Sequence, residues 1–118
     1  MSGRHQLEQL AVLGQLILDA KLSALRAAAL AREESLARLA DLARPSAAEG
    51  LLPLAAEEVR LRYELWADQR RAEINRLLAQ ETVAWIQARE AATAAFGRTE
   101  ALRGLQARLP RARPTEAG

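Results

Sequence analysis

Apolar residues recur at intervals of three and four positions along two long stretches of the chain that lack proline. Residues with this spacing lie on one face of an α-helix, so the pattern predicts two helices, over about residues 5–43 and 54–109. Pro45, Gly50 and Pro53 interrupt the pattern and predict a hairpin tip at 44–52. At 1.5 Å per residue the helices would be roughly 58 and 84 Å long. The sequence therefore predicts an all-α fold, an elongated antiparallel two-helix coiled-coil hairpin with a longer second helix.

Each predicted helix has an apolar face that is expected to pack against the other. In the first helix the face comprises Leu10, Leu13, Ile17, Ala20, Ala24, Leu25, Ala28, Ala31, Leu36, Leu39 and Leu42. In the second helix it comprises Val59, Tyr63, Trp66, Ile74, Leu77, Ala84, Ala88, Ala91, Ala95, Leu102 and Leu105. Strict heptads fail at Arg32, or at Glu34 and Arg38 in another phase. An imperfect, alanine-rich helix pair is thus favoured over a leucine zipper.

The segments outside the helices carry their own signals. Residues 46–49, with the sequence SAAE, match a capping box, in which the serine and glutamate side chains bind free backbone N–H groups. Gly50 is expected to end that short turn, and Pro53 suits the first turn of a helix. Residues 110–118 are rich in proline, arginine and alanine, and we expect a disordered tail there.

The unequal helix lengths predict an unpaired segment. If the chain turns near Ala48, Leu39 faces Glu57 and Leu10 faces Ile86, and nothing remains to cover residues 87–109. An apolar helix face without an internal partner is typical of an interface. The residues predicted to bind a partner protein are Trp85, Ala92, Phe96, Arg98, Leu102, Arg103 and Leu105.

The two tryptophans and the single phenylalanine, Trp66, Trp85 and Phe96, differ in their expected roles. Trp66 lies within the paired zone and is expected to fill the seam between the helices. Trp85 and Phe96 are eleven residues apart, which leaves them only about 20° apart around the helix. For Trp85 a seam position and an interface position both stay open, whereas Phe96 falls in the predicted unpaired segment.

Composition narrows the classes of fold and function. The chain has 27 alanines and 21 leucines but three valines and three isoleucines, and aromatic residues are 3% of the total. β-Sheets need β-branched and aromatic residues, so this composition favours long helices. Cysteine is absent and His5 is the single histidine, which leaves no thiol nucleophile, His-based metal cluster or catalytic triad. We therefore expect a non-enzymatic protein without a metal or cofactor.

Charge and hydropathy give weaker indications. The net charge is +2, and residues 98–118 carry five arginines against two glutamates. That basic end leaves nucleic-acid or membrane-surface binding open as an alternative function. The longest apolar runs are far shorter than the roughly 20 residues that span a bilayer. No signal-peptide pattern opens the chain, so a cytoplasmic location is expected, with at most peripheral membrane contact.

Residues 62–106 resemble a known family. Their sequence is RYELWADQRRAEINRLLAQETVAWIQAREAATAAFGRTEALRGLQ. Two long antiparallel helices, with spaced aromatics, an A-R-E segment at 88–90 and an E-x-L-x-x-L segment at 100–105, are similar to the FliJ-type proteins of flagellar export. They are also similar to the YscO-type proteins of type III secretion, and the resemblance extends over roughly residues 7–108.

This resemblance implies a stalk that binds the hexameric export ATPase ring, couples it to the membrane export gate and hydrolyses nothing itself. A generic coiled-coil adaptor or homodimeric scaffold remains the first alternative. Whether the helices pair within one chain or between chains stays open.

Overall fold

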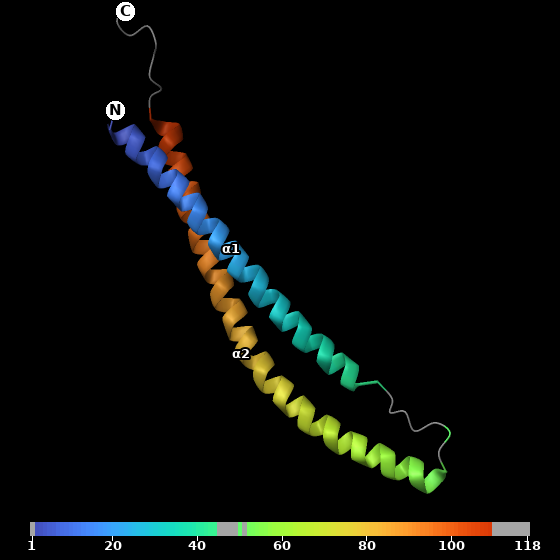
Figure 1. The fold of residues 1–118 in the computed structure, drawn as a ribbon. Helices are drawn as coiled ribbons and strands as arrows, with labels where there is room; N and C mark the ends of the chain where they lie inside the picture. The colour runs from blue at the N-terminus through green and yellow to red at the C-terminus, as the bar shows by residue number, and fades with distance from the viewer. Residues whose placement is uncertain (1, 45–49, 51, 110–118) are drawn as a thin grey trace, which may run out of the picture. The chain divides into compact units, whose positions relative to one another are not determined.

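The computed structural model describes residues 2–44, 50 and 52–109, and this part of the chain is all-α. Helix α1 spans Ser2–Leu42 and helix α2 spans Pro53–Arg108, with 41 and 56 residues (Figure 1). The predicted fold class, a helical hairpin with a longer second helix, is confirmed. The predicted helix ends were close, since α1 begins three residues earlier than expected and α2 one residue earlier.

The connection between the helices is described only in part. Gly50 has a φ of 84°, a left-handed conformation that glycine adopts without strain. Pro53 is the first residue of α2, where its missing N–H costs nothing. The N–H of Ala56 donates to the carbonyl of Leu52 at 2.7 Å and closes the first turn. The predicted capping box at 46–49 and the predicted disordered tail at 110–118 lie outside the described residues.

The described residues form two compact units, each of which is a pair of antiparallel helix segments (Figure 1). In the terminal unit, residues 2–26 of α1 lie beside residues 87–108 of α2. The central unit comprises residues 27–42 of α1 and residues 53–86 of α2. Because the chain reverses direction between α1 and α2, the start of α1 and the end of α2 belong to the same unit.

The central unit has a small apolar core near the end of α1. Leu42, Ala67 and Ile74 are buried there, and Leu39 and Tyr63 pack against them. The Tyr63 hydroxyl donates to the carbonyl of Leu42 at 3.4 Å, which satisfies a carbonyl at the end of α1. The end of α1 is thus fixed beside Tyr63, ten residues after the start of α2.

A polar layer interrupts the seam of the central unit. Ser35 is fully buried, and its hydroxyl donates to Oε1 of Glu81 at 2.5 Å. Arg32 donates from Nε to the Thr82 hydroxyl at 3.1 Å, and its guanidinium lies 5.3 Å from the ring centroid of Trp85. Arg32, which breaks the predicted heptad pattern, therefore lies in the seam and is accommodated there by a hydroxyl and an aromatic ring.

Small side chains dominate the seam of the terminal unit. Ala92, Ala95 and Thr99 of α2 are buried, and Leu18 is the buried residue of α1. The Thr99 hydroxyl lies 3.0 Å from the carbonyl of Ala95 and 3.4 Å from that of Gly14, so it faces an acceptor on each helix. A Cβ at Gly14 would lie only 3.2 Å from Cδ1 of Leu102. Glycine here allows α1 and α2 to approach closely.

The prediction that residues 87–109 lack an internal partner was wrong. Gly14 lies beside Thr99 and Ser35 beside Glu81, so the chain folds about a point near residue 57 and not near Ala48. The estimate failed because it assumed that pairing begins directly at the connection. The first turns of α2 instead precede the level at which α1 ends, and Leu52, Leu54 and Leu61 are 78%, 86% and 58% exposed.

The predicted seam was also out of phase in the first half of α1. Leu10 and Leu13 are 51% and 52% exposed, and Ile17 is 37% exposed. The residues of α1 that are buried or half-buried in the terminal unit include Leu7, Ala11, Gly14, Leu18, Leu22 and Leu25. Several predicted seam residues outside this region are exposed as well: Leu36, Val59, Trp66, Leu77 and Leu105. The beginning of α1 is apolar on several faces, and periodicity alone did not distinguish the buried row from its neighbour.

Candidate protein-binding surface

The seven residues predicted to bind a partner divide into packed and exposed positions. Ala92 is 5% exposed and lies in the terminal seam. Leu102 is half-buried against the backbone of Gly14. Trp85 is half-buried beside Arg32 in the central unit, which settles its position in favour of the seam.

The other four predicted residues, Phe96, Arg98, Arg103 and Leu105, are exposed and lie on two different faces of α2. Phe96 and Arg103 are seven residues apart, as are Arg98 and Leu105, and such pairs share a helix face. Phe96 and Leu105 are nine residues apart, which places them on roughly opposite sides of the helix at 3.6 residues per turn. The single apolar strip expected from the sequence is therefore two separate surfaces.

The first surface, the Phe96 face, carries an aromatic ring beside an ion pair. Phe96 is 55% exposed. Nη1 of Arg103 lies 3.0 Å from Oε1 of Glu100, one turn further along α2. An exposed ion pair of this kind contributes little to stability, so both charges remain available to a partner.

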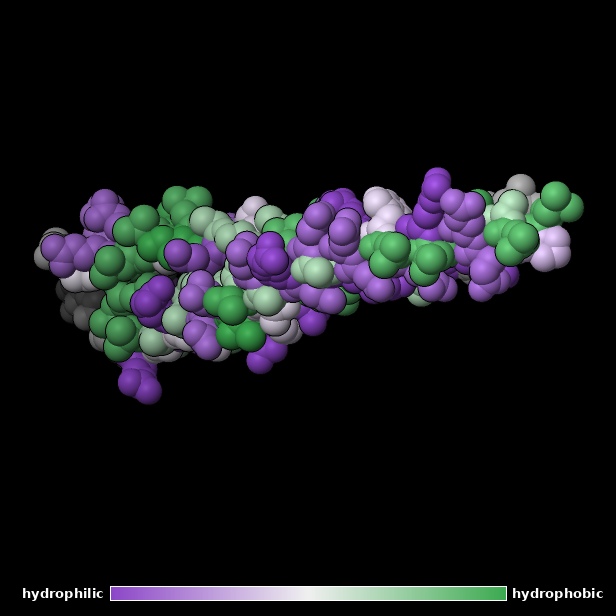
Figure 2. All heavy atoms as spheres, turned by 90° about the horizontal axis from the view of Figure 1, so that it is seen from below, coloured by the Kyte–Doolittle hydropathy of each residue, from purple (hydrophilic) through white to green (hydrophobic). Residues whose placement is uncertain are grey.

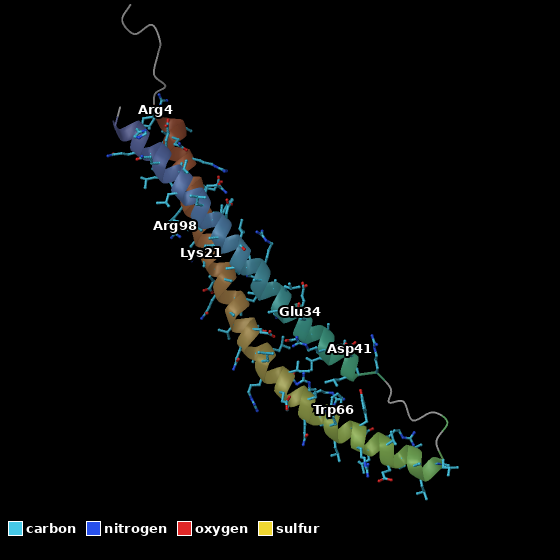
Figure 3. All side chains as sticks on the ribbon, viewed as in Figure 1. Arg4, Lys21, Glu34, Asp41, Trp66 and Arg98 are labelled. Atoms are coloured by element: carbon cyan, nitrogen blue, oxygen red, sulfur yellow. The ribbon has the colours of Figure 1, made fainter. Side chains whose placement is uncertain are left out.

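The second surface is a groove between the two helices of the terminal unit. It has a volume of about 160 Å³ and is lined by Leu10, Leu13, Gly14, Ile17, Ala95, Arg98 and Leu102. All of these residues except Arg98 are apolar. Arg98 is exposed and has no hydrogen bond or ion pair with any described residue, and its side chain is labelled in Figure 3.

On α2 of the terminal unit, small residues are buried and bulky apolar ones are not. The buried residues of this segment are Ala92, Ala95 and Thr99, whereas Phe96 is 55% exposed, as are Leu10 and Leu13 of α1 to a similar extent. Figure 2 shows hydrophobic residues gathered over the end of the molecule where α1 begins and α2 ends. Large apolar side chains that remain exposed next to buried small ones indicate a surface that another molecule covers.

The sequence analysis missed the groove, although the sequence contains a signal for it. Leu10, Leu13, Ile17, Ala20 and Ala24 repeat with heptad spacing. Four members of this row directly precede Ala11, Gly14, Leu18 and Leu25, which belong to the neighbouring row that faces α2. Two offset apolar rows on one helix are typical of a helix with two neighbours, because each row packs against a different helix.

The described residues contain a further apolar surface on α1. Val12, Leu13 and Leu16 form a shallow hollow with His5, Glu8 and Gln9 on α1 alone. In residues 2–44, 50 and 52–109, no group of three or more histidine or acidic side chains is placed to hold a metal ion. Neither α1 nor α2, as far as they are described, has a stretch long and apolar enough to cross a membrane.

Comparison of the chain with protein-family models, with curated proteins and with solved structures gives no match.

Proposed function

We propose that this chain is a non-enzymatic helical hairpin that binds a partner protein through the Phe96 face. The observation that carries the proposal is the 55% exposure of Phe96, which lies next to the buried Ala92 and Ala95 on α2. Exposing an aromatic ring while burying methyl groups forgoes the larger hydrophobic gain within the chain. That gain becomes available when a partner covers the ring.

The composition of this face suits protein recognition. Aromatic and arginine side chains are enriched among the residues that contribute most to binding. Arg103 lies seven residues from Phe96 on the same face, with Glu100 beside it. Apolar contact with Phe96 would supply affinity, and the charged residues would fix the orientation of the partner.

The resemblance to export stalk proteins supplies the partner in this proposal. The hairpin would insert its terminal unit into the ring of a hexameric export ATPase in the cytoplasm and couple the ring to the membrane export gate. In this proposal the chain acts as a stalk in the central hole of the ring, as the γ subunit does in rotary ATPases. The Phe96 face would then contact the inner wall of the ring.

The test is binding of the purified chain to the export ATPase of the same organism, measured by co-elution and by fluorescence titration. Phe96→Ala should weaken binding by roughly tenfold or more, since truncation of a central aromatic residue costs 1–2 kcal/mol or more. Arg103→Glu should weaken it as well and make it less sensitive to salt.

Val12→Ala is the matched control, because Val12 is 63% exposed in the same unit but lies on α1. It should leave the dissociation constant unchanged. Undetectable binding by the unmodified chain would overturn the export-stalk assignment. Equal loss of affinity in Phe96→Ala and Val12→Ala would overturn the assignment of the Phe96 face.

A further inference from the structure

We propose that the groove of the terminal unit is the contact surface of a homodimer, in which a second copy packs antiparallel across it. The groove is on the side of α2 away from Phe96, so this inference is independent of the proposed function. It begins from a row of α1 residues at heptad spacing, Leu10, Leu13, Ile17, Ala20 and Ala24, of which the first three line the groove. All five are exposed in the single chain.

The side-chain sizes in this row would fit the same row of a second, antiparallel copy. Its first part carries the bulky residues Leu13 and Ile17, and its second part carries Ala20 and Ala24. In a two-fold dimer, residue i of one copy contacts residue j of the other and the reverse. An axis at the level between Leu18 and Asp19 would place Leu13 against Ala24 and Ile17 against Ala20 of the second copy. Large and small side chains would then alternate across the contact, as in packed helix bundles.

The charges on α2 agree with the same axis. Because Gly14 lies beside Thr99, the level between Leu18 and Asp19 on α1 corresponds to about residue 94 or 95 on α2. An antiparallel copy rotated about that level brings Arg98 to about residue 91 of its partner, next to Glu90. Neither Arg98 nor Glu90 has an ion pair or hydrogen bond within the described part of the chain.

The side-chain sizes of the α1 row and the charges of Arg98 and Glu90 on α2 therefore indicate the same two-fold axis, although the two observations come from different helices. The Arg98–Glu90 contact would occur twice in a dimer, as two-fold symmetry requires. Ala94, near the axis, is exposed and small enough to let the two α2 helices approach. Lys21 is exposed on α1, four residues after Ile17 and seven after Gly14, so it lies on the groove side of the helix, and its long side chain would have to carry its charge out to solvent. The result is a four-helix arrangement of two hairpins.

The experiment measures the mass of the intact chain by light scattering and sedimentation over about 1 to 100 μM. The unmodified chain should reach twice its monomer mass of 12.9 kDa. Arg98→Glu and Glu90→Arg should each raise the dimer dissociation constant by more than about tenfold, because each places two like-charged pairs in contact. The double variant with both substitutions should restore the dimer, since it exchanges the two charges.

Leu13→Asp should also give a monomer, and circular dichroism should show that every variant keeps its helix content. Phe96→Ala is the control and should leave the dimer intact, so loss of the dimer and loss of partner binding are separable results. A monomeric unmodified chain at the highest concentration would overturn the proposal. So would single variants that remain dimeric, or a charge-exchanged variant that stays monomeric.

Discussion

Gly14 offers the most specific test of how the two helices pair. It lies inside α1, where glycine is less favourable than alanine by up to about 1 kcal/mol. A Cβ at this position would lie 3.2 Å from Cδ1 of Leu102 and 3.7 Å from Oγ1 of Thr99. Gly97 of α2 is the matched control, since a Cβ there has nothing within 4 Å.

The size of the substituted side chain decides the sign of the effect. Gly14→Ala requires only that the flexible end of half-buried Leu102 shift by a few tenths of an ångström, so the helix-propensity gain should prevail. Gly14→Ala and Gly97→Ala should each raise Tm by up to about 4 °C for a chain of this size. Gly14→Leu forces further methyl groups into the seam, and overpacking of this kind costs about 1–3 kcal/mol.

The two leucine variants should therefore diverge. Gly97→Leu keeps most of the propensity gain, so its Tm should exceed that of Gly14→Leu by about 4–12 °C. Adding Leu102→Ala to Gly14→Leu should recover part of the loss by making room. The Tm of all five variants is measured by thermal unfolding followed by circular dichroism. Equal Tm values for the two leucine variants would show that Gly14 does not lie against α2, and the reasoning would fail.

Three other substitutions test the packing in unfolding experiments. Ile74→Ala, at a position that is 3% exposed, should cost about 2–5 kcal/mol, whereas Leu77→Ala, at 41% exposure, should cost much less. Leu18→Asp should unfold the terminal unit because it buries an unpaired charge, while Leu16→Asp, at 60% exposure, should leave Tm nearly unchanged. Ser35→Ala removes the donor to a half-buried carboxylate and should destabilise the chain by about 1–3 kcal/mol in urea unfolding.

The fold class followed from the sequence because the signals for it are local. Helix formation depends on residues that are close together in the chain. The helix-forming composition, the long stretches without proline and Pro53 at the start of α2 therefore predicted the two helices correctly. Pairing between α1 and α2 depends on contacts far apart in the chain, such as that of Gly14 with Thr99, 85 residues away. Counting back from an assumed turn could not locate those contacts: it pairs Gly14 with Thr82 where the structure pairs it with Thr99, so the register was displaced by about 17 positions.

The candidate site was only partly predictable for a related reason. Phe96 was correctly expected to be accessible, but the argument for it was wrong, since α1 does cover this part of α2. Arg32 appeared to disrupt a seam, and it lies in the seam because Thr82 and Trp85 provide it with partners there. Periodicity identifies apolar rows, but the choice between adjacent rows depends on side-chain sizes on both helices.

The pairing of α1 with the end of α2 is the central claim, and an engineered disulfide tests it most directly. The chain has no cysteine, so a pair introduced by Gly14→Cys and Thr99→Cys has no competitor. Oγ1 of Thr99 is 3.7 Å from the position of a Cβ at residue 14, close to the geometry that a disulfide requires.

Under mild oxidation this pair should form an intramolecular disulfide, detected by mass spectrometry of the monomer, and it should raise Tm. The alternative pair Gly14→Cys and Thr82→Cys corresponds to a turn near Ala48 and should remain reduced within the chain, because Thr82 lies against Arg32. Efficient closure of the 14–82 pair, with no closure of the 14–99 pair, would contradict the pairing of α1 with the end of α2.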